Sequence, residues 1–136
     1  MSYYPLNSIP DYYGIDDLLT EEHILIRNSV RDWVQSFIMP QIDDAAQHHK
    51  DIPNLMKELG AIGALGPYIP EEYGGAGLDQ ISYGLIMQEL ERGDSAVRSA
   101  ASVQSSLVMF PIFEFGSEEQ KRKYLPKLAS GEFIGA

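Results

Sequence analysis

The sequence SAVRSAASVQSSLVMFPIFEF, residues 95–115, predicts the central helix of the molecule. Its first half is rich in alanine and serine, whose small side chains let neighbouring backbones approach closely. Its second half is apolar as far as Pro111, which cannot donate a hydrogen bond to the carbonyl of Leu107 and should kink the helix. Such a helix is typical of an element that has partners on several sides.

Helix signals lie on both sides of this stretch. Gly93 separates it from a broadly apolar helix expected over about 79–92. Downstream, Ser117 and Gln120 have the spacing of a capping box, so a further helix is expected over 117–129.

Two more helices are expected nearer to the N-terminus. Thr20 is a good N-cap for an amphipathic helix that lasts until Pro40, which breaks or kinks it. The polar segment 41–50 can continue as an exposed helical piece. Asp51 is the expected N-cap of the next helix, which Gly60 ends.

Five or six helices with little strand predict an all-α fold, an antiparallel or orthogonal helical bundle, over residues 20–131. Residues 132–136 have the pattern of the first residues of a β-strand, and the sequence ends there. Residues 1–19 form an N-terminal extension, expected to be an extended arm. Its tyrosines should lie against the body of the protein: Tyr3, Tyr4, Tyr12 and Tyr13.

The composition excludes several classes of function. The 136 residues include 20 acidic and 10 basic side chains, a net charge of -10, which argues against binding nucleic acid or anionic membranes. The absence of cysteine excludes disulfides, cysteine-ligated metals and thiol catalysis. Neither a secretory signal nor an apolar run of roughly 20 residues is present, so we expect a cytoplasmic protein.

Several smaller motifs have ordinary structural explanations. The stretch GGAG at 74–77 lacks the lysine of a phosphate-binding loop, which favours a turn with positive φ. Asp44 and His48 share a helix face, but two ligands do not make a metal site, so we expect no metal. The basic run 121–123 has glutamates on its own helix, which favours a solvated face over a polyphosphate contact. His23 has no evident partner.

Arg98 is the strongest candidate for a functional residue, because it is a charge within a helix that otherwise looks buried. The structural explanation is an ion pair with Asp94, one turn earlier. The functional explanation is a guanidinium that binds a ligand carboxylate, assisted by the hydroxyls of Ser99 and Ser102. The sequence contains no convincing catalytic constellation, so no catalytic residue is nominated.

Three ordered motifs resemble the N-terminal part of the acyl-CoA dehydrogenase family, and the match runs from about residue 20 to residue 136. They are PEEYGGAG at 70–77, ELERGDS at 89–95, and GSEEQK at 116–121 followed by YLP at 124–126. The stretch RSAASVQSSLVM, which begins at Arg98, is similar to the glutaryl-CoA dehydrogenase branch of that family.

The resemblance implies a role for Arg98 and a larger parent enzyme. In that branch the matching arginine holds the distal carboxylate of the substrate, with hydroxyls matching Ser99 and Ser102 nearby. Family members bind FAD, are usually tetramers and pass electrons to an electron-transfer flavoprotein. Their glutamate base lies in a C-terminal domain. The glutaryl branch converts glutaryl-CoA to crotonyl-CoA with loss of CO2.

The same resemblance implies that this chain is one domain of three. Residues 132–136 would be the first residues of a missing middle β-domain, and the chain would contribute one wall of the acyl pocket. We therefore expect the 136-residue chain alone to be inactive and to retain no FAD, and we nominate no FAD-binding residue. Two alternatives stay open: another short-chain acyl-CoA dehydrogenase, or a stand-alone helical module that binds a partner, suggested by the end at residue 136.

Overall fold

The computed structural model describes residues 11–135, which form helices and connecting loops without a β-strand. The predicted all-α fold is therefore confirmed. The α-helices are α1 (Glu21–Trp33), α2 (Met39–His48), α3 (Leu55–Ala61), α4 (Gln80–Gly93), α5 (Ser95–Ser102), α6 (Phe110–Phe115) and α7 (Glu118–Ala129). Two 3-10 turns (Ile15–Leu18 and Glu71–Tyr73) and two π-helical turns (Val34–Ile38 and Val103–Met109) complete the elements.

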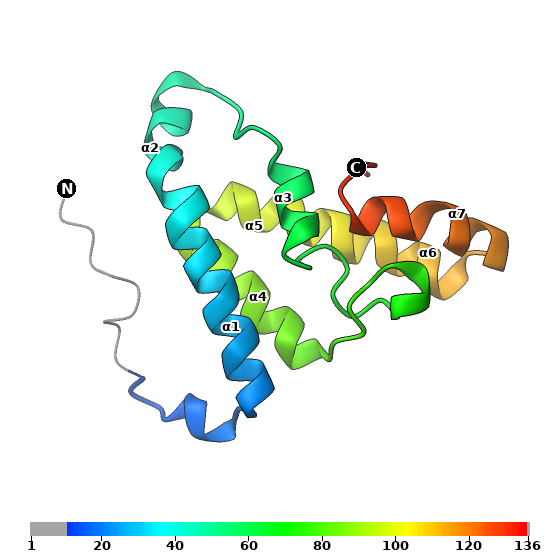
Figure 1. The fold of residues 1–136 in the computed structure, drawn as a ribbon, viewed down its shortest axis with the longest axis horizontal. Coiled ribbons are helices and arrows are strands. Elements are labelled where there is room, and N and C mark those ends of the chain that lie inside the picture. Colours follow the sequence, from blue (N-terminus) through cyan, green and yellow to red (C-terminus); the bar gives the residue numbers. More distant parts are fainter. Residues whose placement is uncertain (1–10, 136) are drawn as a thin grey trace.

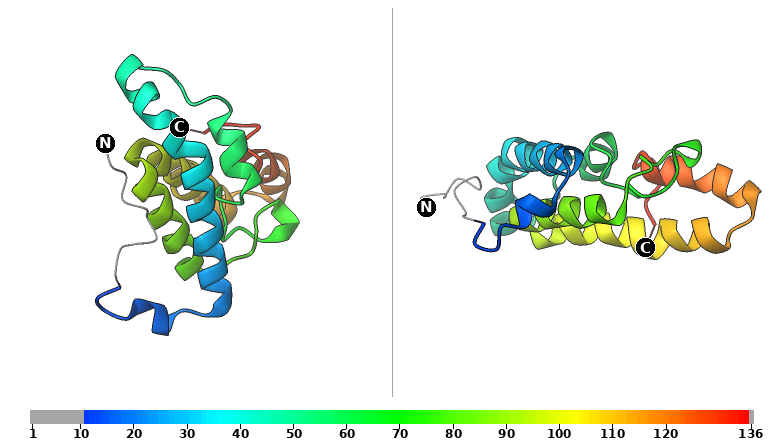
Figure 2. Two further views of the ribbon diagram at one scale, coloured as in Figure 1. Left: turned by 60° about the vertical axis from the view of Figure 1, so that its left-hand side comes forward. Right: turned by 90° about the horizontal axis from the view of Figure 1, so that it is seen from below.

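The predicted central helix runs along the molecule as α5, a π-helical turn and α6 (Figure 1). Helices α3 and α7 pack against it, α4 joins it at its N-terminal end, and α1 packs on α4. Seen from below, α1, α3 and α7 lie in one layer, and α4, α5 and α6 lie in the other (Figure 2). The core between them is apolar and closed to solvent, and it includes Val34, Ile38, Leu59, Leu90, Val97, Ala101, Met109 and Leu125.

The helix starts are set by local capping bonds. The side chains of Thr20, Asp79, Asp94 and Ser117 each accept a backbone N–H two or three residues further on, at 2.8–3.3 Å. These bonds satisfy N–H groups that a helix end leaves without partners. The four starts therefore lie where the sequence predicts them.

The prediction for α3 was wrong at its start. This helix begins at Leu55 after Asn54, which has a left-handed backbone (φ 57°), and Asp51 does not cap it. Ile52 precedes Pro53, and a residue before proline is disfavoured in the helical conformation. The chain therefore makes a turn first, and the helix continues one residue beyond Gly60.

Pro40 and Pro111 are each preceded by one of the π-helical turns. A proline within an α-helix removes one hydrogen bond, and its ring clashes with the carbonyl four residues back. A π-helical turn shifts the bonding by one residue. The expected breaks therefore take the form of widened turns, and the helical path continues through both prolines.

The two ends of the described chain differ from expectation. Tyr12 and Tyr13 are 87% and 90% exposed, so the prediction that they lie against the body was wrong, and the other two tyrosines of the arm lie outside the described residues. Residues 132–135 form no strand. Their assignment to a β-domain stays a prediction. No helix within residues 11–135 is both long and apolar enough to cross a membrane.

Candidate functional site

The candidate site is centred on Arg98, in the first turn of α5. The expected ion pair with Asp94 is not formed, because the Asp94 carboxylate accepts the backbone N–H groups of Ala96 and Val97 as the helix cap. Instead, Nε of Arg98 donates to Oε2 of Glu91 at 2.7 Å. The capping aspartate and the pairing glutamate thus have separate roles.

Glu91 lies in the last turn of α4 and has two donors. Besides Arg98, the hydroxyl of Ser95 donates to its Oε1 at 2.6 Å. Both bonds lower the pKa of Glu91, and the larger contribution comes from Arg98. The glutamate therefore stays ionised at neutral pH and fixes the direction of the guanidinium.

The pair leaves most donors of Arg98 free. Its side chain is 36% exposed, and within residues 11–135 the structure records no hydrogen bond from Nη1 or Nη2. Ser99 and Ser102 are half-buried, the first adjacent to Arg98 and the second one turn further along the helix. Arg98 and Ser102 share a helix face, and a guanidinium beside a hydroxyl is a donor set suited to a carboxylate.

The histidines do not form a metal site. His48 pairs with Asp44 at 2.9 Å on an exposed helix end. His23 is 7% exposed, and its Nε2 lies 2.8 Å from Oδ2 of Asp79, so the expectation that it has no partner was wrong. Among the described residues, no three histidine or acidic side chains gather in a way that could hold a metal ion.

The glycine-rich turn is explained by packing. A Cβ added at Gly75 would lie 1.9 Å from the carbonyl oxygen of Ile69. At Gly74 the backbone has φ 86°, and a Cβ there would lie 2.9 Å from Cα of Pro126. The turn therefore packs closely on the protein itself, and this packing accounts for its glycines.

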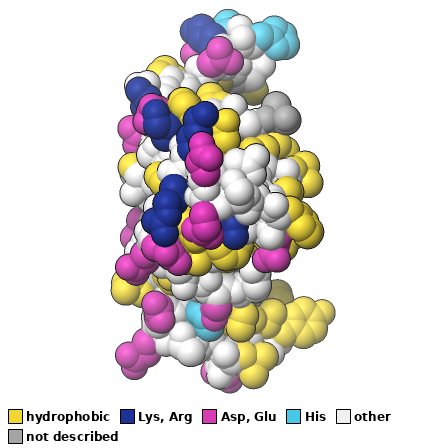
Figure 3. Space-filling view, turned by 90° about the vertical axis from the view of Figure 1, so that its right-hand side faces the viewer, with side chains coloured by type: hydrophobic (Ala, Val, Ile, Leu, Met, Phe, Trp, Pro, Cys, Tyr) yellow, Lys and Arg dark blue, Asp and Glu magenta, His cyan; other side chains and the backbone are white. Residues whose placement is uncertain are grey.

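The expected pair of Glu118 with Arg122 is formed on α7, whereas Lys123 lies over the ring of Tyr124 and no ion pair with Glu119 is recorded within residues 11–135. Arg122 lies 3.7 Å from Glu118 and 3.8 Å from Glu72, and Lys121 lies 3.8 Å from Glu118. The space-filling view of this end of the molecule shows basic and acidic side chains interleaved (Figure 3). A mixed surface of this kind favours solvation over polyphosphate binding.

Comparison with known proteins gives consistent matches over most of the chain. The sequence profile of the family described as "Acyl-CoA dehydrogenase, N-terminal domain" matches residues 20–132. A probable acyl-CoA dehydrogenase of Bacillus subtilis (strain 168) is 44% identical over 118 residues, which are 86% of this chain and 20% of that protein. The mitochondrial isovaleryl-CoA dehydrogenase of Pongo abelii is 38% identical over 120 residues, 87% of this chain and 28% of that protein.

Solved structures give the same fold. A glutaryl-CoA dehydrogenase from Mycobacterium smegmatis in complex with FADH2 superposes with a TM-score of 0.86 at 42% identity, over 90% of this chain and 31% of that chain. The present sequence therefore spans less than a third of the proteins that it matches.

Proposed function

The chain belongs to the acyl-CoA dehydrogenase family and corresponds to the N-terminal domain of its members. On that premise, we propose that it builds part of the acyl pocket of a glutaryl-CoA dehydrogenase. Residues Arg98, Ser99 and Ser102 are the proposed partners of the distal carboxylate of the substrate. The parent enzyme would oxidise glutaryl-CoA and release CO2 to give crotonyl-CoA.

The observation that carries this proposal is the orientation of Arg98 by Glu91. Nε of Arg98 donates to Glu91 at 2.7 Å, and this bond holds the guanidinium in one orientation. The N–H groups of Nη1 and Nη2 stay available for a ligand. A fork of two N–H groups matches a carboxylate in geometry and in charge. The ordered, unused donors are what a binding residue needs, since little conformational freedom is lost when the ligand arrives.

The same arginine supplies selectivity. A dicarboxylate loses its hydration in a closed acyl pocket, and this cost is offset only if the charge is paired. A monocarboxylic acyl chain would leave Arg98 covered and without a ligand partner, which disfavours that substrate.

Flavin chemistry belongs to other parts of the proposed parent enzyme. FAD would accept the hydride from the substrate, and we nominate no residue of this chain as a ligand of its phosphates. We propose that the parent binds FAD, forms a tetramer, transfers electrons to an electron-transfer flavoprotein and is cytoplasmic. The isolated 136-residue chain is expected to be colourless and inactive. The absorbance of flavin in the purified chain tests this expectation.

The substrate proposal is tested by Arg98→Ala in the full-length enzyme, assayed on glutaryl-CoA and on butyryl-CoA. The variant should lose activity mainly on glutaryl-CoA, by about ten- to a hundredfold in kcat/KM, since a charge-assisted hydrogen-bonded pair is removed. Equal losses on both substrates would refute the carboxylate role. Asp44→Ala, at an exposed ion pair outside the site, is the control and should leave both activities unchanged.

A second candidate is another short-chain acyl-CoA dehydrogenase activity. The 38% identity to an isovaleryl-CoA dehydrogenase favours it, because that value is close to the identity with a glutaryl-CoA dehydrogenase. Product analysis distinguishes the two candidates. Crotonyl-CoA with CO2 supports the first, and an enoyl-CoA formed without CO2 supports the second.

A further inference from the structure

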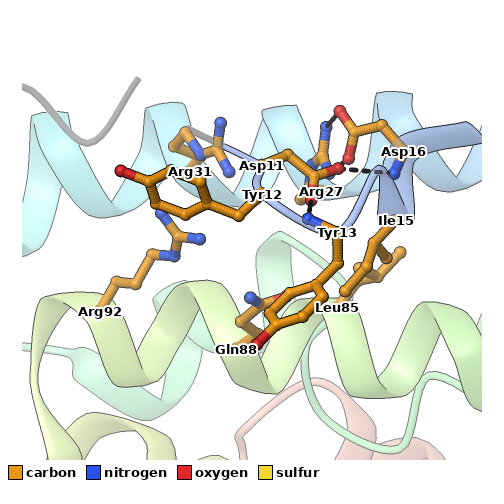
Figure 4. A pocket seen from close by; sticks show the side chains of 10 residues that line it. All are labelled: Asp11, Tyr12, Tyr13, Ile15, Asp16, Arg27, Arg31, Leu85, Gln88 and Arg92. Carbon is orange, nitrogen blue, oxygen red and sulfur yellow. Dashed lines mark hydrogen bonds and ion pairs between the residues drawn. The ribbon is translucent and has the colours of Figure 1, made fainter. Parts of the chain in front are cut away.

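A cavity of about 310 Å³ lies between the N-terminal segment of the described chain, α1 and α4. Its walls include three arginines in a protein whose net charge is -10: Arg27, Arg31 and Arg92. Figure 4 shows Arg31 and Arg92 approaching each other from opposite helices beside the ring of Tyr12, with Gln88 below them. The cavity is separate from the Arg98 site, which it does not include.

Arg31 and Arg92 share one buried carboxylate. Glu89 is fully buried and accepts from Nε and Nη2 of Arg31 at 3.0 and 2.9 Å. Nε of Arg92 lies 3.6 Å from the same glutamate, which is beyond a good hydrogen bond. Two guanidinium groups therefore share one carboxylate, and only that of Arg31 is hydrogen-bonded to it.

The other acidic side chains of the cavity are committed elsewhere. Asp16 forms a forked pair with Arg27. Asp11 accepts the backbone N–H groups of Tyr13 and Asp16 at 3.3 and 2.9 Å, so its carboxylate is turned to its own segment. Residues 1–10, MSYYPLNSIP, contain no acidic side chain.

Several donors around the cavity lack partners. Within residues 11–135, no hydrogen bond is recorded from Nη1 of Arg31 or from either Nη of Arg92. Nε of Arg27 is buried and also has no partner there. Guanidinium groups with free N–H edges bind carboxylate and phosphate oxygens in the same forked geometry.

We propose that this cavity binds a small oxyanion, the carboxylate or phosphate group of a ligand, between Arg31 and Arg92. Gln88 contributes an amide donor, and Tyr12 lines the cavity with most of its side chain exposed to solvent. The volume accommodates a small ligand and not a large cofactor. The proposal is independent of the function of Arg98, since the two sites share no residue.

The test is a titration of the ¹⁵N-labelled 136-residue chain, followed by the NMR signals of the Gln88 side-chain amide and of the arginine Nε–H groups. Sodium phosphate and sodium acetate are added separately at constant ionic strength. At least one anion should give saturable shifts at Gln88, Arg31 and Arg92, with a Kd in the millimolar range. The anion that saturates identifies the group.

Arg92→Gln should weaken binding at least about tenfold, because it removes one of the two guanidinium groups that hold the anion and leaves Glu89 paired with Arg31. Arg122→Gln carries the same change of charge on α7 and should leave binding unchanged. If the first variant does not fold, Gln88→Leu takes its place and should weaken binding severalfold. The proposal is overturned if neither anion gives saturable shifts at these groups, or if Arg92→Gln and Arg122→Gln bind alike.

Discussion

The backbone N–H of Gly135 donates to the side-chain oxygen of Gln104 at 2.9 Å. Gln104 is 1% exposed, and its amide nitrogen also donates to the carbonyls of Leu128 and Phe133, at 2.9 and 2.8 Å. One buried amide in the central helix therefore holds both the end of α7 and the segment that follows it. The direction in which the chain leaves the helical domain is fixed by this contact.

Gln104→Leu should destabilise the chain by about 1–3 kcal/mol. Leucine has a similar volume, but it leaves the carbonyls of Leu128 and Phe133 without their donor and the N–H of Gly135 without its acceptor. The free energy of unfolding in urea measures the loss, and hydrogen exchange at Gly135 should become faster. Gln88→Leu, at an exposed position, should change stability by less than about 0.5 kcal/mol. Unchanged exchange at Gly135 would contradict the clamping role.

The sequence predicts those parts of the fold that depend on neighbouring residues. Thr20 and Ser117 bond within three residues of themselves, so their caps follow from the local sequence. The start of α3 was missed because Pro53 acts on the conformation of its neighbour and delays the helix. The π-helical turns were missed because they depend on how the whole helix packs around Pro40 and Pro111.

Interactions between distant segments were the harder part of the site. Arg98 was identified from its charge in a helix of small residues. Its partner Glu91 lies in the preceding helix, and because a break separates the two helices, helical spacing does not predict this contact. His23 and Asp79 are separated by 56 positions and meet only through the packing of α1 on α4. A charged residue such as Glu89 looks like a surface residue in sequence, although it is fully buried.

Glu89→Gln should destabilise the protein by about 3–5 kcal/mol, because the amide keeps the shape of glutamate but leaves the Arg31 charge without its partner. Urea denaturation measures this loss. The double variant Glu89→Leu with Arg31→Met replaces both charges with apolar groups and should recover much of the stability. Asp44→Asn, at an exposed ion pair, should cost less than about 1 kcal/mol. If Glu89→Gln destabilises the protein no more than Asp44→Asn does, the buried pair contributes little to the free energy of unfolding.

The stability of the chain should fall as the pH drops from about 4 towards 2, in part through Asp79. Its pKa is lowered from 3.8 to about 2, first by the backbone N–H of Ser82 and then by His23. Because the folded-state pKa is depressed, the stabilisation is complete above the unfolded value and is lost as the carboxylate is protonated.

Asp79→Asn keeps the capping oxygen but cannot titrate, so its unfolding free energy should depend less steeply on pH across that interval. His23→Gln removes the second partner of Asp79 and retains an acceptor for the backbone N–H of Thr20, so it should give an intermediate slope. Unfolding curves at several pH values measure both slopes. Parallel curves for wild type and Asp79→Asn would show that another group controls the acid limb.

Gly75→Ala and Gly84→Ala should change stability in opposite directions. The new Cβ at Gly75 would lie 1.9 Å from the backbone oxygen of Ile69, and the turn must open to admit it, at a cost of about 1–3 kcal/mol. Gly84 lies on the exposed side of α4, and a Cβ there meets nothing within 4 Å, so alanine should add about 0.5–1 kcal/mol. Thermal unfolding of the two variants measures the difference. If Gly75→Ala proves as stable as wild type, close packing is not the reason for glycine in this turn.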